Sequence, residues 1–84
     1  GTPPTEVNLL GYRVAEALPR LERYLDHAFQ AGLPRVRIIH GKGSGRLRQA
    51  VLDYLRSHPA VKAFVPCSPQ EGGWGATAVE LDVN

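Results

Sequence analysis

The sequence predicts an α+β fold: a two-layer βαβαββ sandwich in which two helices cover one face of a four-stranded mixed sheet. Two stretches carry apolar residues at every third or fourth position, as amphipathic helices do. Four shorter stretches are rich in Val, Ile and Leu, which is typical of strands. Because the helices fall between the first three strands, these strands can run parallel, and two helices suffice to cover one face only.

Size and composition limit the class of protein. The 84 residues form one domain, 43% of them are hydrophobic, and no apolar run approaches a membrane span of about 18 residues. The single cysteine, Cys67, excludes a disulfide framework and a cysteine-rich zinc site, and we expect it to be inert in a reducing, cytoplasmic setting. The net charge of +2 permits nucleic acid as a partner, and no membrane partner is expected.

The absence of methionine indicates a piece of a larger protein, to whose other domains the chain would be tethered. The first five residues include two prolines and no apolar pattern. We therefore expect residues 1–5 to be linker or cloning residue and residues 6–84 to form the domain.

The first half of the chain predicts a strand, a helix and a second strand. Residues Glu6–Leu10 and Arg35–His40 are the predicted strands. The helix begins at Val14 and stops at Gly32. Its apolar stripe consists of Val14, Leu18, Leu21, Leu25 and Ala28. Pro19 lies beyond the first turn and lacks an N–H, which predicts a kink or a later helix start.

The second half predicts a loop, a helix and two strands. The glycine-rich loop Gly41–Gly45 precedes the helix, and Ser44 is the expected N-cap. The apolar stripe of this helix is Leu47, Val51 and Leu55. Residues Val61–Pro66 and Ala76–Val83 are the last strands, joined by the loop Cys67–Gly75.

Alternation along the strands predicts which side chains face the helices. The inward set is Val7, Leu9, Val36, Ile38, Thr77, Val79, Leu81 and Val83. The outward set is Arg35, Arg37, Glu80 and Asp82.

The loop between the second strand and the second helix is suited to binding an anion. Glycines permit close approach of a phosphate, and a helix N-terminus offers unpaired N–H groups and about half a positive charge. Lys42, Arg46 and Arg48 add cations, and His40 can exchange a proton near neutral pH. This combination favours binding a phosphodiester, and His40 could take part in cleaving it.

Two better-known phosphate motifs do not fit this loop. A P-loop would need glycine where Val36 stands and Ser or Thr where Gly43 stands. A dinucleotide-binding fingerprint would need glycine where Arg46 stands. These mismatches count against a third class of function, a small-molecule phosphate-binding domain.

Several segments, in order and at matching spacing, resemble one family. The segment Ile39–Gly45, followed by Leu47 and Val51, resembles the His-Gly-x-Gly motif of small MutS-related (Smr) domains. The segment Glu71–Leu81 resembles the C-terminal glycine motif and last strand of that family. Val7–Gly11 occupies the place of its opening Leu-Asp-Leu-(Arg or His)-Gly motif.

The resemblance implies a fold similar to the C-terminal domain of translation initiation factor three, with sheet order 1-2-4-3 and an antiparallel last strand. It implies the C-terminal domain of a bacterial MutS type-two protein. The implied activity is endonucleolytic: nicking of duplex or branched DNA in DNA repair and recombination suppression. Other members cleave RNA, bind RNA or act in ribosome rescue.

The chain departs from the family at the opening motif. The family Asp is Asn8 and the family Arg or His is Leu10, so a carboxylate and a cation are both missing. Asn is no base and is a poorer ligand than a carboxylate for Mg²⁺ or Mn²⁺, the ions such a nuclease would use. No motif demands a cofactor, and no residue is predicted as a metal ligand.

The implied sheet order predicts that some charged residues pair within the protein. Arg35 and Arg37 would pair with acids of the neighbouring last strand. Glu16 and Arg20 lie four residues apart on the helix and pair with each other at least as plausibly as with a ligand. The basic residues then left without partners are Arg13, Lys42, Arg46 and Arg48. Trp74 either stacks on a nucleic-acid base or covers the edge of the core.

We therefore predict an endonuclease domain whose substrate is DNA, with RNA or the ribosome as the alternative partner. His40 is the proton donor or acceptor or, alternatively, a hydrogen-bonded residue at the strand end. Lys42 stabilises phosphate charge, and Glu71 is the nominated carboxylate. The nucleic-acid-binding set is Asn8, Arg13, Gly41, Gly43, Ser44, Gly45, Arg46, Arg48 and Trp74. The alternative function is a binding module with weakened catalysis.

Overall fold

The computed structural model describes residues 2–71 and 73–83, except for the side chain of Glu71. The elements are β1 (Glu6–Asn8), α1 (Val14–Gln30), β2 (Arg35–Ile39), α2 (Arg46–Arg56), β3 (Val61–Pro66) and β4 (Ala76–Leu81). Two short 3₁₀ turns, η1 (Pro69–Glu71) and η2 (Gly73–Gly75), occupy the connection that was predicted as loop. The predicted βαβαββ order is confirmed.

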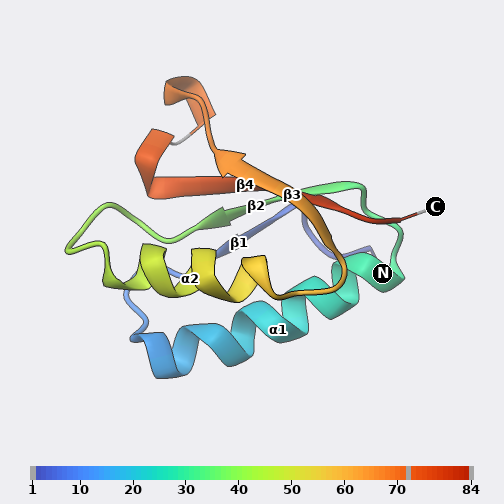
Figure 1. Ribbon diagram of the computed structural model, residues 1–84, viewed down its shortest axis with the longest axis horizontal. Helices are drawn as coiled ribbons and strands as arrows, with labels where there is room; N and C mark the ends of the chain where they lie inside the picture. Colours follow the sequence, from blue (N-terminus) through green and yellow to red (C-terminus); the bar gives the residue numbers. More distant parts are fainter. Residues whose placement is uncertain (1, 72, 84) are drawn as a thin grey trace.

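The four strands form one mixed sheet in the order β1-β2-β4-β3. β1 and β2 are parallel, and β4 runs antiparallel to both of its neighbours. Both α-helices pack on the same face of the sheet, and the described residues place no α-helix on the other face (Figure 1). The sheet order and the two-layer arrangement therefore agree with the prediction.

The core lies between the helices and the covered face of the sheet. Except for Val14 and Thr77, all residues of the two predicted helix stripes and of the predicted inward set belong to it. Its fully buried large side chains are Leu9, Leu21, Leu25, Ile38, Val51, Leu55 and Val79. Burying each of them contributes about 1.5–3 kcal/mol, so the apolar pattern itself fixes which face of every element turns inward.

The first helix begins at Val14 and continues through Pro19 to Gln30, so the predicted later start is wrong. The Glu16 carboxylate accepts the backbone N–H of Arg13 at 3.2 Å, which satisfies a donor at the helix start. Pro19 is exposed, so its ring points away from the core. Burial of Leu21 and the stripe beyond it outweighs the hydrogen bond that proline cannot make.

Three strands end earlier than predicted. Asn8 Oδ1 accepts the N–H of Leu10 at 2.9 Å, and this Asx turn ends β1. β2 ends at Ile39, because the N–H groups of His40 and Gly41 both bond to the carbonyl of Gly75, at 3.0 and 2.9 Å, and this interrupts the regular ladder. β4 ends at Leu81, two residues before the predicted end.

The charged residues on the uncovered face pair differently from the prediction. Arg37 forms an ion pair with Glu6, which lies opposite it on β1. Arg35 lies opposite Glu80, as predicted, but no ion pair joins them in the described part of the chain. The nearest acid to Arg37 comes from the parallel neighbour, which the sequence prediction overlooked.

The predicted pair between Glu16 and Arg20 is also wrong. The Glu16 carboxylate is used at the helix start. The Arg20 guanidinium instead lies 4.2 Å from the centroid of the Tyr12 ring. Such a cation–π contact is worth about 0.5–1 kcal/mol at an exposed position, and here it orients the ring that precedes the helix.

The N-terminal residues that were predicted as linker contact the domain. Pro3 is buried, and the carbonyl of Thr5 accepts the N–H of Arg37 at 2.9 Å. The Tyr24 hydroxyl donates to the carbonyl of Pro4. Burial, with a smaller contribution from the charge of Glu6, raises the pKa of Tyr24 to about 12, so this donor keeps its proton.

Residues 1, 72 and 84 lie outside the described part of the chain.

None of the described helices has the length and apolar character needed to cross a membrane.

Candidate functional site

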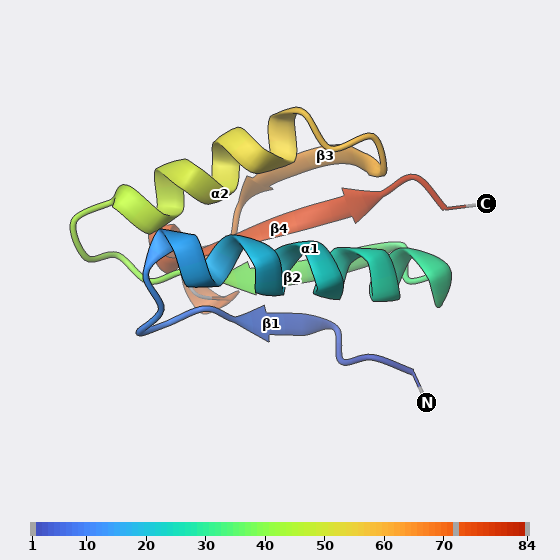
Figure 2. The ribbon, with the colours of Figure 1, turned by 90° about the horizontal axis from the view of Figure 1, so that it is seen from below.

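The candidate site lies where β1 and β2 end and α2 begins. Figure 2 shows the carboxyl ends of both strands and the start of α2 at the same end of the molecule. A pocket of about 290 Å³ opens there. Its lining residues are Leu10, Gly11, Tyr12, His40, Gly41, Lys42, Gly43, Ser44, Gly45, Leu47 and Arg48. We call this pocket the loop pocket.

Glycines set the path of the loop. Gly41, Gly43 and Gly45 have φ values of +81°, +28° and +86°, a region that other residues rarely adopt. Gly45 is the N-cap of α2, so the predicted N-cap role of Ser44 is wrong. The Ser44 hydroxyl accepts the N–H of Arg46 only at 3.4 Å, because the left-handed residue after it turns the helix start away.

The start of α2 is positively polarised. Its first turn contains no acidic residue and carries Arg46 and Arg48. The first N–H groups of a helix have no intrahelical acceptor, and the helix dipole adds about half a positive charge. Lys42 is exposed on the loop directly before this turn. Cations from the loop and from the helix therefore converge on one pocket.

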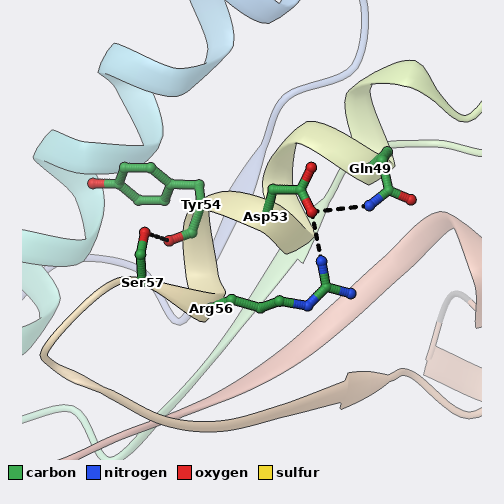
Figure 3. A network of polar contacts seen from close by, with 5 residues as sticks. All are labelled: Gln49, Asp53, Tyr54, Arg56 and Ser57. Carbon is green, nitrogen blue, oxygen red and sulfur yellow. Dashed lines mark hydrogen bonds and ion pairs between the residues drawn. The ribbon is translucent and has the colours of Figure 1, made fainter.

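The other end of α2 is electrically balanced. Figure 3 shows Asp53 accepting hydrogen bonds from Gln49 and Arg56, and the Ser57 hydroxyl donating to the carbonyl of Tyr54. The Asp53–Arg56 pair neutralises the arginine of the last turn. The basic residues of α2 that remain available for an external anion are therefore at its start.

His40 forms the inner wall of the loop pocket and is only 5% exposed. Its Nδ1 lies 3.0 Å from the carbonyl of Gly41, and its Nε2 lies 2.9 Å from the Thr77 hydroxyl. A carbonyl can only accept, so Nδ1 carries the proton and the neutral ring accepts the Thr77 hydroxyl at Nε2. Both ring nitrogens are thus engaged within the protein, as the strand-end alternative predicted.

Burial lowers the pKa of His40 below its ordinary value of 6.5. The hydrogen bond to the Gly41 carbonyl opposes this shift, and the charge of Arg48 adds to it. The ring is therefore neutral at neutral pH. A bound phosphate would act in the opposite direction, because a nearby negative charge favours the imidazolium.

A second glycine segment, Gly73–Gly75, borders the site. The carbonyl of Gly75 accepts the N–H groups of both His40 and Gly41, at 3.0 and 2.9 Å. The Arg48 guanidinium lies 5.0 Å from the centroid of the Trp74 ring. Two motifs that lie far apart in the sequence are thereby joined at the loop pocket.

Trp74 is 67% exposed, so of its two predicted positions the structure rules out a cover over the core edge. Its ring contacts Arg48, which was predicted to have no partner. This contact leaves the indole accessible beside the loop pocket.

Four described residues of the predicted site do not line the loop pocket: Asn8, Arg13, Arg46 and Trp74. Arg13 is exposed at the start of α1. Asn8 is exposed, and its side-chain oxygen is used in the turn to Leu10. The Glu71 side chain lies outside the described residues, so its predicted role is not placed by the structure.

Five contributors were absent from the predicted site set: Thr77, Leu10, Gly11, Tyr12 and Leu47. Thr77 was predicted only as an inward strand residue, but the β2–β4 register brings it to His40. Leu10, Gly11, Tyr12 and Leu47 line the loop pocket, and Leu10 had been noted only as a departure from the family motif. For Thr77, the available signal was its position directly after the glycine motif. Placing it beside His40 would have required the register between β2 and β4.

The described donor atoms do not fit a bound divalent metal. No group of three His, Cys, Asp or Glu side chains comes together in residues 2–71 and 73–83. The Asn8 oxygen that would replace the family carboxylate is already an acceptor for Leu10. We therefore derive no step through Mg²⁺ or Mn²⁺ from these residues.

The family model for the Smr domain matches residues 7–82. The chain belongs to the Smr domain family. The crystal structure of the Smr domain of Thermus thermophilus MutS2 is similar to it, with a TM-score of 0.90 and 45% identity, over 93% of this chain and 98% of that one. YdaL, a stand-alone small MutS-related protein from Escherichia coli, has a TM-score of 0.86 and 32% identity, over 92% and 63% of the two chains.

The Smr domain also has longer relatives. Endonuclease MutS2 of Thermomicrobium roseum is 56% identical over 78 residues, and that of Geobacillus thermodenitrificans is 55% identical over 76 residues. These alignments cover 93% and 90% of this chain but 10% of each relative. The chain thus corresponds to about a tenth of a MutS2 protein.

Proposed function

We propose that this Smr domain is an endonuclease module that binds the phosphate backbone of DNA at the loop pocket and cleaves a phosphodiester bond there. One observation carries the proposal: the loop pocket is lined by Lys42 and Arg48 and by no carboxylate among the described residues. The relatives named endonuclease MutS2 support a nuclease.

Binding would rest on charge and on backbone donors. A phosphate in the loop pocket would accept N–H groups from the first turn of α2 and would contact the Lys42 ammonium. Arg46 and Arg48 would contact flanking phosphates, since both lie on that turn. Such contacts are independent of base sequence, so they suit a domain that acts on the backbone.

Cleavage would require His40 to change a hydrogen-bond partner. Its Nε2 accepts the Thr77 hydroxyl, so proton transfer with substrate needs that contact to open, and Nδ1 is held by Gly41. RNA would supply a 2′-hydroxyl as its own nucleophile, whereas DNA would need an activated water. Glu71 remains the carboxylate we nominate to activate that water.

The experiment is a cleavage assay of the purified domain on supercoiled plasmid, branched DNA and single-stranded RNA, with Mg²⁺, Mn²⁺ or chelator. We expect nicked products from wild type and their loss in His40→Ala and Lys42→Ala. Gln30→Ala, an exposed change at the far end of α1, is the control. Cleavage that survives both site substitutions would refute the assignment.

A second candidate is a binding module that positions nucleic acid for the rest of a larger protein. It is favoured by two observations: both nitrogens of His40 are engaged, and Asn8 replaces the family carboxylate. Salt-sensitive binding of DNA or RNA without any cleavage would select this function over the first.

The wider roles follow from the substrate. Preference for branched DNA would support recombination suppression and DNA repair, and preference for RNA would support ribosome rescue. Because the chain spans about 10% of the length of its MutS2 relatives, we propose that other domains deliver it to its substrate in the cytoplasm.

A further inference from the structure

A second pocket, of about 380 Å³, lies on the face of the sheet that the helices leave uncovered. Figure 1 shows the segment between β3 and β4 projecting from the sheet on the side away from both helices. This segment overhangs the carboxyl end of β2. The lining residues are Leu10, Arg37, Ile39, Gly41, Lys42, Gln70, Gly75 and Ala76. We call this pocket the sheet pocket.

The sheet pocket adjoins the loop pocket. Leu10, Gly41 and Lys42 line both of them and form a shared ridge. Leu10 packs closely on Gly41 in this ridge, where an added Cβ would come within 2.6 Å of Leu10 Cδ2. Because the two pockets share these lining residues, a nucleic-acid strand whose phosphate occupies the loop pocket has its next chemical group beside the sheet pocket.

The walls of the sheet pocket differ from those of the loop pocket. Ile39 and Ala76, which are paired across β2 and β4, form an apolar floor, and Leu10 contributes an apolar wall that is 53% exposed. Besides Lys42 on the shared ridge, two polar side chains line this pocket. Arg37 is oriented by its ion pair with Glu6.

The second polar side chain is Gln70 of η1. Its amide offers both donors and an acceptor. An apolar floor with a few oriented polar groups is typical of sites for flat organic ligands, and about 300–1,000 Å³ is their usual volume. A phosphate makes no favourable contact with an apolar floor. A nucleobase has two flat apolar faces that can pack on such a floor and a polar edge that can form hydrogen bonds.

We propose that the sheet pocket binds one unpaired nucleobase of the strand whose phosphate binds in the loop pocket. This inference rests on the proposed function and extends it to substrate selection. The domain then selects strands in which a base is unstacked beside the bound phosphate, as at a branch, a gap or a single strand. DNA and RNA share this chemistry, and both are included in the test.

The experiment compares two strands of equal length and charge, oligothymidylate and its abasic counterpart, bound to the 84-residue chain in fluorescence anisotropy. We expect the base-containing strand to bind about fivefold to tenfold more tightly. The dependence on salt should be the same for both strands, since both carry the same phosphates.

Two substitutions address the sheet pocket alone, because Ile39 and Gln70 do not line the loop pocket. Ile39→Ala and Gln70→Ala should each reduce the advantage of the base-containing strand and leave abasic binding unchanged. Val65→Ala, an exposed aliphatic truncation on β3, and Gln30→Ala are the matched controls. Thermal melting followed by circular dichroism confirms that each variant is folded.

The outcomes separate the two proposals. Salt-sensitive binding of both strands with equal affinity would overturn the nucleobase subsite and leave the proposed function standing. Failure of both strands to bind would overturn the proposed function itself. Equal weakening of both strands by Gln70→Ala would also overturn the subsite, because that residue would then act on the backbone. Repetition with oligouridylate and abasic RNA shows whether DNA, RNA or both supply the base.

Discussion

At the scale of single residues, His40 joins the two halves of the site. Its ring spans from the carbonyl of Gly41 in the loop to the hydroxyl of Thr77 on β4. Burial makes these contacts worth more than the same contacts in water, since an unpaired ring nitrogen would carry a desolvation cost of about 1–3 kcal/mol. The imidazole is therefore a structural bridge in the unbound protein, whatever it does during catalysis.

The depressed pKa of His40 predicts how stability varies with pH. In the folded protein the pKa is lowered by burial, so below its ordinary value of 6.5 the unfolded chain binds the proton more readily. The contribution of His40 to the free energy of unfolding is thus complete above pH 6.5 and declines as pH falls through the folded pKa. Urea titrations of wild type and His40→Gln test this. The variant should lose less stability on acidification, and parallel curves would contradict the prediction.

Trp74 gives a second prediction at this scale. Its exposed ring, held beside Arg48, can stack on a base, and such stacking is worth about 1 kcal/mol or more. Trp74→Ala should therefore weaken single-strand binding roughly fivefold, and Trp74→Phe should retain most of the affinity. Because the chain has one tryptophan, quenching of its fluorescence reports the contact directly. Unchanged affinity in Trp74→Ala would exclude stacking.

At the scale of elements, the glycine loop determines where α2 begins. A left-handed residue at Gly45 starts the helix, and the carbonyl of Gly75 holds the opposite end of the loop. The loop conformation thus depends on backbone geometry more than on side chains. The loop pocket therefore lies beside the start of α2, with Gly45, Leu47 and Arg48 among its lining residues.

Glycine substitutions should rank by backbone conformation. Gly45→Ala and Gly41→Ala each force a positive φ on alanine and should cost about 1–2 kcal/mol of stability. Gly75→Ala has an ordinary φ and contacts no closer than 3.6 Å, so it should stay within about 0.5 kcal/mol. Denaturant melts of the three variants measure the ranking. A Gly75→Ala variant less stable than the other two would contradict it.

At the scale of the whole molecule, the charges are sorted by position. Arg37 and Arg56 are neutralised by ion pairs with Glu6 and Asp53. Lys42, in contrast, lies directly before the first turn of α2, and that turn contains no acidic residue. A net charge of only +2 therefore conceals a local positive site. Local charge of this kind directs a polyanion to one end of the sheet.

The salt dependence of binding should reveal this sorting. Lys42→Ala should lower the slope of log K against log salt concentration by about one, because one phosphate contact is lost. Arg56→Ala removes the same charge from a residue that is paired at the far end of α2, so its slope should match wild type. Equal slopes for both variants would show that the loop lysine does not contact phosphate.

Much of the fold could be predicted from local patterns. The bounds of Val61–Pro66 agree with the prediction, and the apolar stripes of both helices face the core as expected. The ends of the other strands were less predictable: a local Asx turn at Asn8 ends β1, whereas β2 ends where Gly75, far along the chain, accepts the N–H groups of both His40 and Gly41. The start of α1 was obscured by Pro19, whose local cost is outweighed by burial farther along the helix.

The site was predictable in its loop and less so in its walls. Glycines and cations adjacent in sequence marked the loop, and Lys42 and Arg48 line the loop pocket as expected. Thr77 and the partner of Trp74 depend on strand register and on a contact between separate elements. Neither can be predicted from the periodicity of one segment. Periodicity indicates which face of an element is buried, but it does not identify the residue that packs against that face.

The position of β4 has a consequence for synthesis of the protein. It is the last described strand in the sequence but lies between β2 and β3 in the sheet. It supplies the Thr77 hydroxyl, and Gly75, whose carbonyl bonds to His40, directly precedes it. While the ribosome is still making the earlier elements, β2 and β3 have no strand to join them and His40 has no hydroxyl to bond. A nascent chain therefore carries no finished site, and the domain becomes competent only when its final strand has emerged.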